Sequence, residues 1–381
     1  MSMIARPSYL DRIDRIWQSM PCVLLVGPRQ SGKTTIARDV VATHGGTLFD
    51  AENLEHVAAL REPLVTLRPL QGLVVIDEVQ HLPDIFRTIR VLVDEPGSDR
   101  RFLLLGSASG DLLRQTAESL TGRIGRIEVR GLSVDECGTD GIADLWNRGG
   151  LPRSYLATTD AASLEWRREY MRSVIERDIP GLGIRTSSER IMRAWMMLMH
   201  SHGDNLNVHE LARSLDVAAP TARGIIDLFT DLMLLRQLQP WFENVEKRQR
   251  KSPKIYVRDA GLLHAALNIA SESDLLVHPK RGASWEGFVI EELIAAHRPD
   301  AAYYWATHQG AELDLLLHKG GRRIGFEVKL TSSPSVTQSM RIAMHDLRLD
   351  AMYVVYAGTN SFTLEPKVTA CSLQDALRMV I

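Results

Sequence analysis

A glycine-rich segment followed by a lysine and a threonine could bind the phosphates of a nucleotide. In CVLLVGPRQSGKTTIARDV, from Cys22 to Val40, the apolar start predicts a buried strand, and a helical pattern follows the glycines. A loop between a strand and a helix can wrap its backbone N–H groups around an anion, which the helix N-terminus also attracts. Lys33 is expected to reach the β- and γ-phosphates of ATP, and Thr34 to ligate Mg²⁺. The predicted nucleotide-binding residues of this segment are Gly27, Pro28, Arg29, Gln30, Ser31, Gly32, Lys33, Thr34 and Thr35.

Two adjacent acids end a second apolar segment, LVVIDE, which runs from Leu73 to Glu78. Four apolar residues predict another buried strand, and Asp77 at its carboxyl end is expected to hold the water shell of the same Mg²⁺ ion. Glu78 is well placed to orient and activate the attacking water. Together with the glycine-rich loop, these acids predict an ATP-hydrolysing site that uses ATP and Mg²⁺.

Four segments of the first half, GPRQSGKTT, VVIDEVQ, LLLGSAS and LTGRIGRIEV, resemble the AAA-type ATPases of bacteria and archaea that carry a C-terminal domain of unknown function. The strands alternate with helices along this part of the chain, which predicts an α/β fold with a parallel sheet and helices on both faces. The resemblance implies ATP hydrolysis in a homo-oligomeric ring, with each active site between subunits. The sequence does not fix the number of subunits, and a hexamer is one candidate.

The resemblance also gives expected roles to a serine and to several arginines. Ser107, at the end of FLLLGSAS, would sense the γ-phosphate, and it is also a good N-cap for the helix that follows. Arg123 and Arg126 lie just before an alternating strand, and either could be an arginine finger that stabilises the transferring phosphoryl group of a neighbouring subunit. The alternative is that both are surface arginines on an edge strand. Arg153 is a third candidate, as an arginine that contacts phosphate within its own subunit.

The middle of the chain predicts a helical lid followed by a winged helix. Residues 207–241 contain a short helix, a turn and a longer helix, and ENVEKRQRKSPKIYVRD then has the pattern of a hairpin. Basic residues cluster at the expected hairpin tip and could contact DNA phosphates: Lys247, Arg248, Arg250, Lys251 and Lys254. Reading of base sequence is not expected, because the longer helix offers only Thr221 and Arg223 as contacts, beside the repulsive Asp227 and Asp231.

A second group of charged residues surrounds the Gly320-Gly321 pair, which predicts a two-residue hairpin turn. Pairing about this turn places Asp314 opposite Glu327, on a face that also carries Glu312 and Lys329. Directly opposed carboxylates repel each other. The fold must therefore place a divalent cation between them or leave this face well solvated.

The order helix, strand, hairpin, helix, strand in the last hundred residues is similar to the PD-(D/E)xK nuclease fold, also called the restriction-endonuclease-like fold. That resemblance implies that Asp314 and Glu327 bind a second metal ion, with Glu286 on the preceding helix and Lys329 nearby. The metal would activate water, and Lys329 would orient the nucleophile or stabilise charge. The alternative is a degenerate nuclease fold that is kept for assembly or for DNA docking.

Bulk composition limits the setting rather than the chemistry. The chain has 381 residues, a formal net charge of −2, and three cysteines outside any C-x-x-C motif. No apolar run reaches about 18 residues, and the N-terminus lacks a signal sequence, so a cytoplasmic protein without a membrane partner is expected. The expected domains are an AAA-type ATPase domain, a helical lid, a winged helix and a nuclease-like domain, at 1–140, 141–200, 201–274 and 275–381.

We therefore predict Mg-dependent ATP hydrolysis that is coupled to binding or remodelling of DNA, with branched or broken DNA as candidate targets. One alternative is a metal-dependent DNA nuclease that is gated by ATP. Another is a nucleotide-switched signalling or scaffold protein that binds a protein partner. DNA-dependent ATP turnover would favour the first hypothesis, and very slow turnover that ignores DNA would favour the last.

Overall fold

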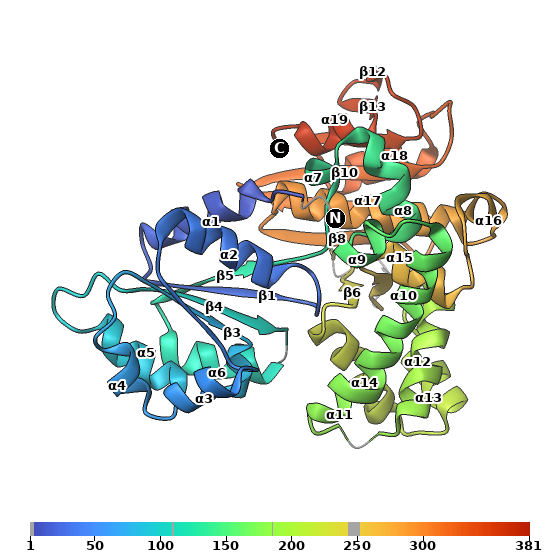
Figure 1. The fold of residues 1–381 in the computed structure, drawn as a ribbon. Coiled ribbons are helices and arrows are strands. Elements are labelled where there is room, and N and C mark those ends of the chain that lie inside the picture. Colours follow the sequence, from blue (N-terminus) through green and yellow to red (C-terminus); the bar gives the residue numbers. More distant parts are fainter. Residues whose placement is uncertain (1–3, 109, 185, 243–251) are drawn as a thin grey trace. The chain divides into compact units, whose positions relative to one another are not determined.

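The computed structural model describes residues 4–108, 110–184, 186–242 and 252–381 (Figure 1). The chain divides into two compact units, which are described one at a time. The first unit comprises residues up to Leu132 together with Asp231–Met233, and the second comprises Ser133–Thr230 and Leu234–Ile381. Within the described ranges, no helix combines the length and the apolar character that a membrane crossing would need.

The first unit is built on a parallel sheet of five strands in the order β2-β3-β4-β1-β5. Strand β1, which lies between β4 and β5, is buried along its whole length, as expected for a parallel sheet that is covered on both faces. The strands are β1 Cys22–Gly27, β2 Thr47–Asp50, β3 Leu73–Asp77, β4 Arg101–Ser107 and β5 Ile124–Glu128. The predicted parallel α/β arrangement of this half is confirmed.

Helices cover both faces of this sheet, and alternate strand residues point to each side. Helices α1 and α2 pack on one face, where Ile13 and Ile36 join the core. Helices α4, α5 and α6 pack on the other, and α5 contributes Ile85, Phe86 and Ile89 from one side of its helix. The helices are α1 Pro7–Trp17, α2 Lys33–His44, α3 Leu54–Ala59, α4 Pro63–Leu67, α5 Ile85–Val93 and α6 Gly110–Leu120, with the 3₁₀ turn η1 Val79–His81.

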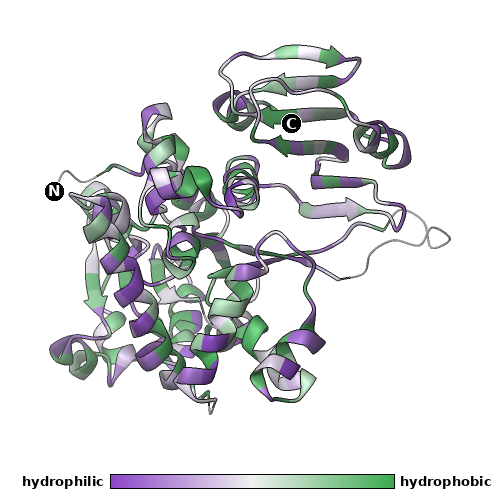
Figure 2. Ribbon diagram, turned by 90° about the vertical axis from the view of Figure 1, so that its right-hand side faces the viewer, coloured by the Kyte–Doolittle hydropathy of each residue, from purple (hydrophilic) through white to green (hydrophobic). Residues whose placement is uncertain are grey.

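The second unit begins with a series of helices. Hydrophobic and hydrophilic residues are interspersed along the helical ribbons of the structure (Figure 2). Its first part contains α7 Val134–Cys137, the 3₁₀ turn η2 Thr139–Gly141, α8 Ile142–Arg148, α9 Pro152–Tyr155, α10 Asp160–Ser173, the π-helical turn η3 Val174–Asp178, α11 Ile179–Gly181 and α12 Ser188–His200. Helices α13 Val208–Leu215 and α14 Ala219–Asp231 follow, and Asp216 between them adopts the left-handed conformation with φ 52°. Strands β6 Leu235–Leu238 and β7 Lys254–Val257 then form an antiparallel pair.

The second unit also contains a mixed sheet of six strands in the order β12-β13-β11-β10-β9-β8. Strands β9 and β10 pair around Gly320 and Gly321, both at positive φ, in the register that was predicted from the sequence. The remaining helices are α15 Ala260–Ala266, α16 Glu272–Val277, α17 Arg281–His297, α18 Gln338–Asp346 and α19 Leu373–Arg378. The strands are β8 Ala301–Ala306, β9 Glu312–Lys319, β10 Arg322–Lys329, β11 Ala351–Tyr356, β12 Phe362–Glu365 and β13 Val368–Cys371.

A buried ion-pair cluster joins the β6–β7 pair to helix α17. Glu291 on α17 is 5 % exposed and accepts hydrogen bonds from Arg236 on β6 and from Arg258, just after β7. Although burial alone would raise the pKa of Glu291, the two guanidinium groups lower it to about 2. The carboxylate therefore stays charged, and it ties together segments that lie more than thirty residues apart.

Two buried histidines of this unit are held in defined tautomers. His202 accepts a hydrogen bond from the Val257 N–H on Nδ1, and its Nε2 lies 3.0 Å from the Ala283 carbonyl oxygen. Burial lowers the pKa of His202 to about 4 and that of His264 to about 3. Below pH 6.5 each of these histidines is therefore protonated in the unfolded chain but stays neutral in the folded chain. The free energy of unfolding consequently decreases as the pH falls from 6.5 toward the folded pKa.

We expect His202→Gln to flatten the acid side of the stability profile of this unit. Each buried histidine contributes a slope of about 1.4 kcal/mol per pH unit between pH 6.5 and its folded pKa. Urea unfolding at pH 7 and pH 5, followed by tryptophan fluorescence, measures this slope, because every tryptophan except Trp17 lies in this unit. The exposed His345 provides the control variant His345→Gln, and an unchanged slope in His202→Gln would contradict the prediction.

Comparing variants with the same parent also isolates the histidine from buried carboxyl groups. Burial raises the pKa of Asp259 and that of Asp314, and such shifts act in the opposite direction because the folded state then holds extra protons. These carboxyl groups are present in both variants, so their contribution cancels in the difference.

Candidate nucleotide site

The loop between β1 and α2 has the backbone shape that anion binding needs. Gly32 has φ 96°, and Gln30 is also in the left-handed region at φ 58°, so the chain turns sharply before α2 begins at Lys33. At Gly27 a Cβ atom would lie 2.0 Å from the Val129 carbonyl oxygen, so a larger residue does not fit there. The Ser31 hydroxyl oxygen is buried without a hydrogen-bond partner in the described structure, which leaves it available to a ligand.

Lys33 and Thr34 meet the second predicted motif at the carboxyl ends of the strands. The Lys33 ammonium group donates to the carbonyl oxygens of Gly27 and Pro28, at 3.0 Å each. The Thr34 hydroxyl donates to Asp77 Oδ2 at 2.7 Å. Burial lowers the pKa of Lys33, and the carboxylates of Glu78 and Asp77 oppose this shift. A hydroxyl and a carboxylate side by side, next to a lysine, fit the Mg²⁺ and phosphates of a nucleotide.

Glu78 follows Asp77 in a conformation that is uncommon for a residue with a side chain. Its φ and ψ are 51° and 43°, its N–H donates to Asp77 Oδ1 at 2.9 Å, and the Gln80 amide group donates to its carboxylate. Such strained backbone is found at functional sites more often than elsewhere. Ser107, at the end of β4, pairs in register with Gly27 and so lies beside the start of the loop. The expected roles of Glu78 and Ser107 remain predictions.

A buried arginine that the sequence analysis did not identify supports the loop from behind. Arg6 is 4 % exposed, and its guanidinium group donates to the carbonyl oxygens of Ser31, Arg130 and Gly131 at 2.8, 3.1 and 3.0 Å. It therefore ties the phosphate loop to the segment that follows β5. The only signal in the sequence was an arginine ahead of Pro7, and that signal says nothing about a distant partner.

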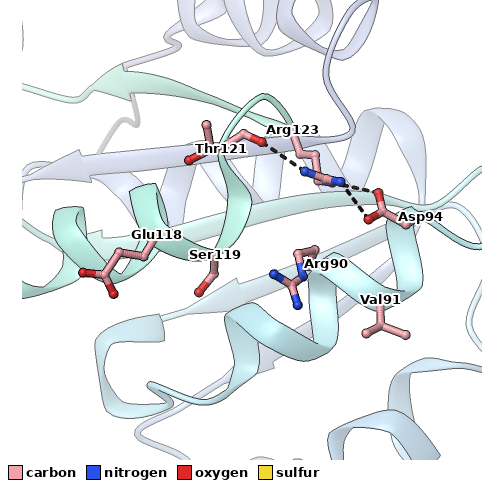
Figure 3. Close-up of a pocket in the computed structure, with 7 residues that line it drawn as sticks. All are labelled: Arg90, Val91, Asp94, Glu118, Ser119, Thr121 and Arg123. Atoms are coloured by element: carbon pink, nitrogen blue, oxygen red, sulfur yellow. Dashed lines mark hydrogen bonds and ion pairs between the residues drawn. The ribbon is translucent and has the colours of Figure 1, made fainter.

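Arg123, the first arginine-finger candidate, is held by an ion pair within its own subunit. Its guanidinium group donates to both carboxylate oxygens of Asp94, at 2.7 and 2.8 Å, and to the Thr121 carbonyl oxygen (Figure 3). The pair lies in a surface pocket of about 560 Å³ that Arg90 also lines. The backbone carbonyl oxygen of Arg123 accepts a hydrogen bond from the Cys22 N–H at the start of β1. Gly27 and the phosphate loop lie at the other end of that strand.

The other arginine candidates lie in different settings. Arg126 is exposed on β5, the edge strand of the sheet. Arg153 is exposed on the short helix α9 of the second unit. Arg29, in the loop itself, has a carboxylate neighbour in Glu52 at 3.6 Å. The structure therefore distinguishes Arg123 by its partner, while the choice among the arginines remains a prediction.

Four of the five residues of the predicted basic cluster lie outside the described structure. The prediction for the fifth residue, Lys254, was wrong. Lys247, Arg248, Arg250 and Lys251 lie outside the described residues. Lys254 was expected at an exposed hairpin tip, but it lies on β7 with 6 % exposure and forms ion pairs with Glu286 and Glu312. The strand continues the pairing with β6 through this residue, so its side chain is directed into the protein rather than toward solvent.

The two carboxylates of the hairpin are paired as expected. The expectation that the face carrying them could be well solvated is wrong. Asp314 and Glu327 are 8 % and 5 % exposed, because β8 and β11 flank the hairpin on both sides. Asp314 Oδ2 accepts the Val328 N–H at 2.8 Å, and Glu327 forms an ion pair with Lys329 at 2.7 Å. Burial raises the pKa of Asp314, and the nearby Glu286 and Glu327 raise it further. Among the described residues, no group of three or more His, Cys, Asp or Glu side chains is arranged to hold a metal ion.

Comparisons with known proteins give three family matches along the chain. A family described as AAA domain matches residues 19–138. Two domains of unknown function, DUF8612 and DUF4143, match residues 139–273 and 281–375. The first match covers the phosphate loop and the two acids, and it confirms the resemblance of this region to an AAA-type ATPase.

Two relatives and one solved structure are also similar to the chain. The uncharacterized protein Rv2008c of Mycobacterium tuberculosis (strain ATCC 25618 / H37Rv) is 48 % identical over 375 residues, which are 98 % of this chain and 85 % of the relative. The uncharacterized protein Mb2031c of Mycobacterium bovis (strain ATCC BAA-935 / AF2122/97) gives the same values. The Walker-type ATPase PABY2304 of Pyrococcus abyssi is 14 % identical, with a TM-score of 0.50, and covers 70 % of this chain and 96 % of its own. This last likeness concerns the fold alone.

Proposed function

We propose that this chain, which belongs to the family of these two mycobacterial proteins and has an AAA-type ATPase domain, hydrolyses ATP with Mg²⁺. We propose that this hydrolysis is coupled to the binding or remodelling of DNA. The observation that carries the hydrolysis is the contact between Thr34 and Asp77, with the Lys33 ammonium group inside the loop. These groups come from α2 and from β3, two elements that only the folded sheet brings together. A nucleoside triphosphate and its metal ion would lie where these groups come together.

Each group in the proposed site has a separate task. The backbone N–H groups of residues 29–35 and the Lys33 ammonium group would hold the phosphates, while Thr34 and Asp77 would hold the Mg²⁺ ion. The ion would supply charge neutralisation on the phosphates. Glu78 would accept a proton from the attacking water, with the Gln80 amide group fixing its carboxylate. Ser107 lies beside Gly27 and would contact the γ-phosphate.

We further propose that the active form is a homo-oligomer in which Arg123 serves a neighbouring subunit. The geometric support is that Arg123 lies at the amino-terminal end of β5, next to the start of β1. The phosphate loop begins at the opposite end of β1, which is six residues long, or about 20 Å at the usual rise per residue. A side chain at this place does not reach the loop of its own subunit.

The coupling to DNA rests on the second unit and on the sequence between its two short strands. Helices α13 and α14 with the β6–β7 pair have the element order of a winged helix, and four basic residues occur in the connecting sequence. We propose contact with phosphates rather than reading of bases, because Arg223 on α14 bonds to Gln237, and the acidic Asp227 is exposed on the same helix. We also propose the four domain ranges 1–140, 141–200, 201–274 and 275–381, the last of which has the element order of a nuclease-like fold.

The test is an ATPase assay without DNA and with single-stranded, duplex or junction DNA, using Lys33→Ala as the background. We expect turnover that Lys33→Ala abolishes and that at least one form of DNA stimulates. Turnover that depends on Lys33 but ignores every DNA form would leave the ATPase standing and would favour the nucleotide-switched scaffold. Turnover that Lys33→Ala leaves unchanged would overturn the proposed site.

A further inference from the structure

Four carboxylates approach one another between helix α17 and the hairpin β9–β10 in the second unit. Glu286 comes from α17, Glu312 and Asp314 from β9, and Glu327 from β10. Asp314 and Glu327 are almost fully buried, and such a concentration of negative charge requires compensating cations in a folded protein. In a nuclease of the PD-(D/E)xK type, the compensating cation would be a divalent metal ion.

A lysine from another part of the unit already supplies positive charge to this cluster. The Lys254 ammonium group lies 3.4 Å from Glu286 Oε1 and forms a closer ion pair with Glu312 Oε1. It is also 5.6 Å from the centroid of the Tyr304 ring, which favours a cation. The Tyr256 hydroxyl donates to Glu286 Oε1, so this carboxylate oxygen already has two protein partners.

The backbone fixes Lys254 in this position. Lys254 pairs with Leu238 across the β6–β7 ladder, and it forms a further antiparallel bridge with Asn205. Its ammonium group therefore cannot leave the cluster by a simple change of loop conformation. A divalent ion placed beside it would meet a like charge at short range in a poorly solvated site, where repulsion is strong.

The rest of the cluster offers little to a metal ion. Lys329 pairs with Glu327 Oε1 at 2.7 Å, and the Val328 N–H occupies Asp314 Oδ2. Glu327 Oε2 is buried without a hydrogen-bond partner in the described structure. Among the described residues, no group of three or more His, Cys, Asp or Glu side chains is arranged to supply the several oxygen ligands that Mg²⁺ requires.

We propose that Lys254 is the resident cation of this acid cluster and takes the place of the divalent metal ion that a nuclease-like fold implies. The cluster then joins strand β7 to the six-stranded sheet and does not hydrolyse phosphodiester bonds. This inference does not depend on the proposed ATPase, because its residues lie outside the phosphate loop and its test uses nucleotide-free protein.

The experiment measures Mn²⁺ binding to the nucleotide-free full chain by calorimetry and by electron paramagnetic resonance. We expect no saturable binding to the wild-type protein and no nicking of supercoiled plasmid with Mn²⁺ or Mg²⁺. Lys254→Met keeps most of the apolar stem and removes the charge, so we expect it to lower the melting temperature and to gain Mn²⁺ binding. Mn²⁺ should then raise the melting temperature of this variant.

Lys280→Met is the matched control, because Lys280 belongs to the same unit but pairs with Asp204 instead of the cluster. It should gain no Mn²⁺ binding. A folded Lys254→Met that ignores Mn²⁺ would overturn the inference, because the lysine and the metal would then not share a place. If Lys254→Met does not fold, the test is made on the wild-type protein. Mn²⁺ binding or plasmid nicking by the wild-type protein that Asp314→Asn abolishes would overturn the inference. Absence of both activities from the wild-type protein would support it.

Discussion

Glu78→Gln is expected to reduce ATP hydrolysis by about 10²–10⁴-fold while ATP binding is retained. The carboxylate of Glu78 is the proposed acceptor of the proton from the attacking water, and glutamine keeps its size but cannot take that proton. Glutamine can also keep the contact with Gln80, so the unusual backbone of residue 78 should survive the change. Turnover is measured with saturating MgATP, and binding with a fluorescent ATP analogue.

Two further variants locate the effect of Glu78→Gln. Lys33→Ala should lose both binding and hydrolysis, because Lys33 is the cation inside the phosphate loop. Glu55→Gln removes an exposed acid from the same unit and should change neither quantity. If Glu78→Gln hydrolysed ATP at the wild-type rate, Glu78 would not be the base, and the neighbouring Asp77 would have to be considered for both tasks.

The phosphate loop could be predicted from the sequence because its parts are local. The loop, its lysine and its threonine are adjacent in the chain, and the spacing of glycines alone requires a turn between a strand and a helix. The same holds for the β9–β10 hairpin, where Gly320 and Gly321 fix the register and place Asp314 opposite Glu327. Local chemistry decided both features, so no knowledge of distant segments was needed.

The surroundings of these features could not be predicted in the same way, because they depend on segments that are distant in sequence. Asp314 and Glu327 are buried because β8 and β11 flank the hairpin, and nothing in the hairpin itself specifies those neighbours. Lys254 belongs to a basic stretch of sequence, and only the pairing of β7 directs it to Glu286 and Glu312. A charged residue gives the same signal in a sequence whether it faces solvent or a buried partner.

The ion pair between Arg123 and Asp94 makes a second strong prediction, since an arginine finger and a carboxylate compete for the same guanidinium group. Carboxylates and phosphates are both bidentate partners of arginine. In the described unit Arg123 holds both oxygens of Asp94 (Figure 3). In the proposed oligomer it would exchange this partner for the γ-phosphate that is bound to the next subunit.

Arg123→Ala is therefore expected to lower ATP turnover by about 10³-fold without weakening ATP binding to the same subunit. Arg126→Ala is the matched variant, on β5 three residues beyond Arg123, and should stay near the wild-type rate. If instead Arg126→Ala loses turnover and Arg123→Ala does not, the assignment passes to Arg126. Steady-state rates at saturating MgATP make this comparison.

Mixing two inactive proteins tests whether Arg123 acts between subunits. Arg123→Ala has an intact phosphate loop, and Lys33→Ala has an intact Arg123, so a mixed oligomer contains interfaces with both groups. In a random equal mixture about a quarter of the interfaces of a head-to-tail ring would be complete. Recovery of turnover on mixing is the expected result. Differential tagging would demonstrate that mixed oligomers have formed. If turnover did not recover in them, Arg123 would act only within its own subunit, and the proposed role between subunits would be wrong. Within one subunit, the length of β1 separates Arg123 from the phosphate loop.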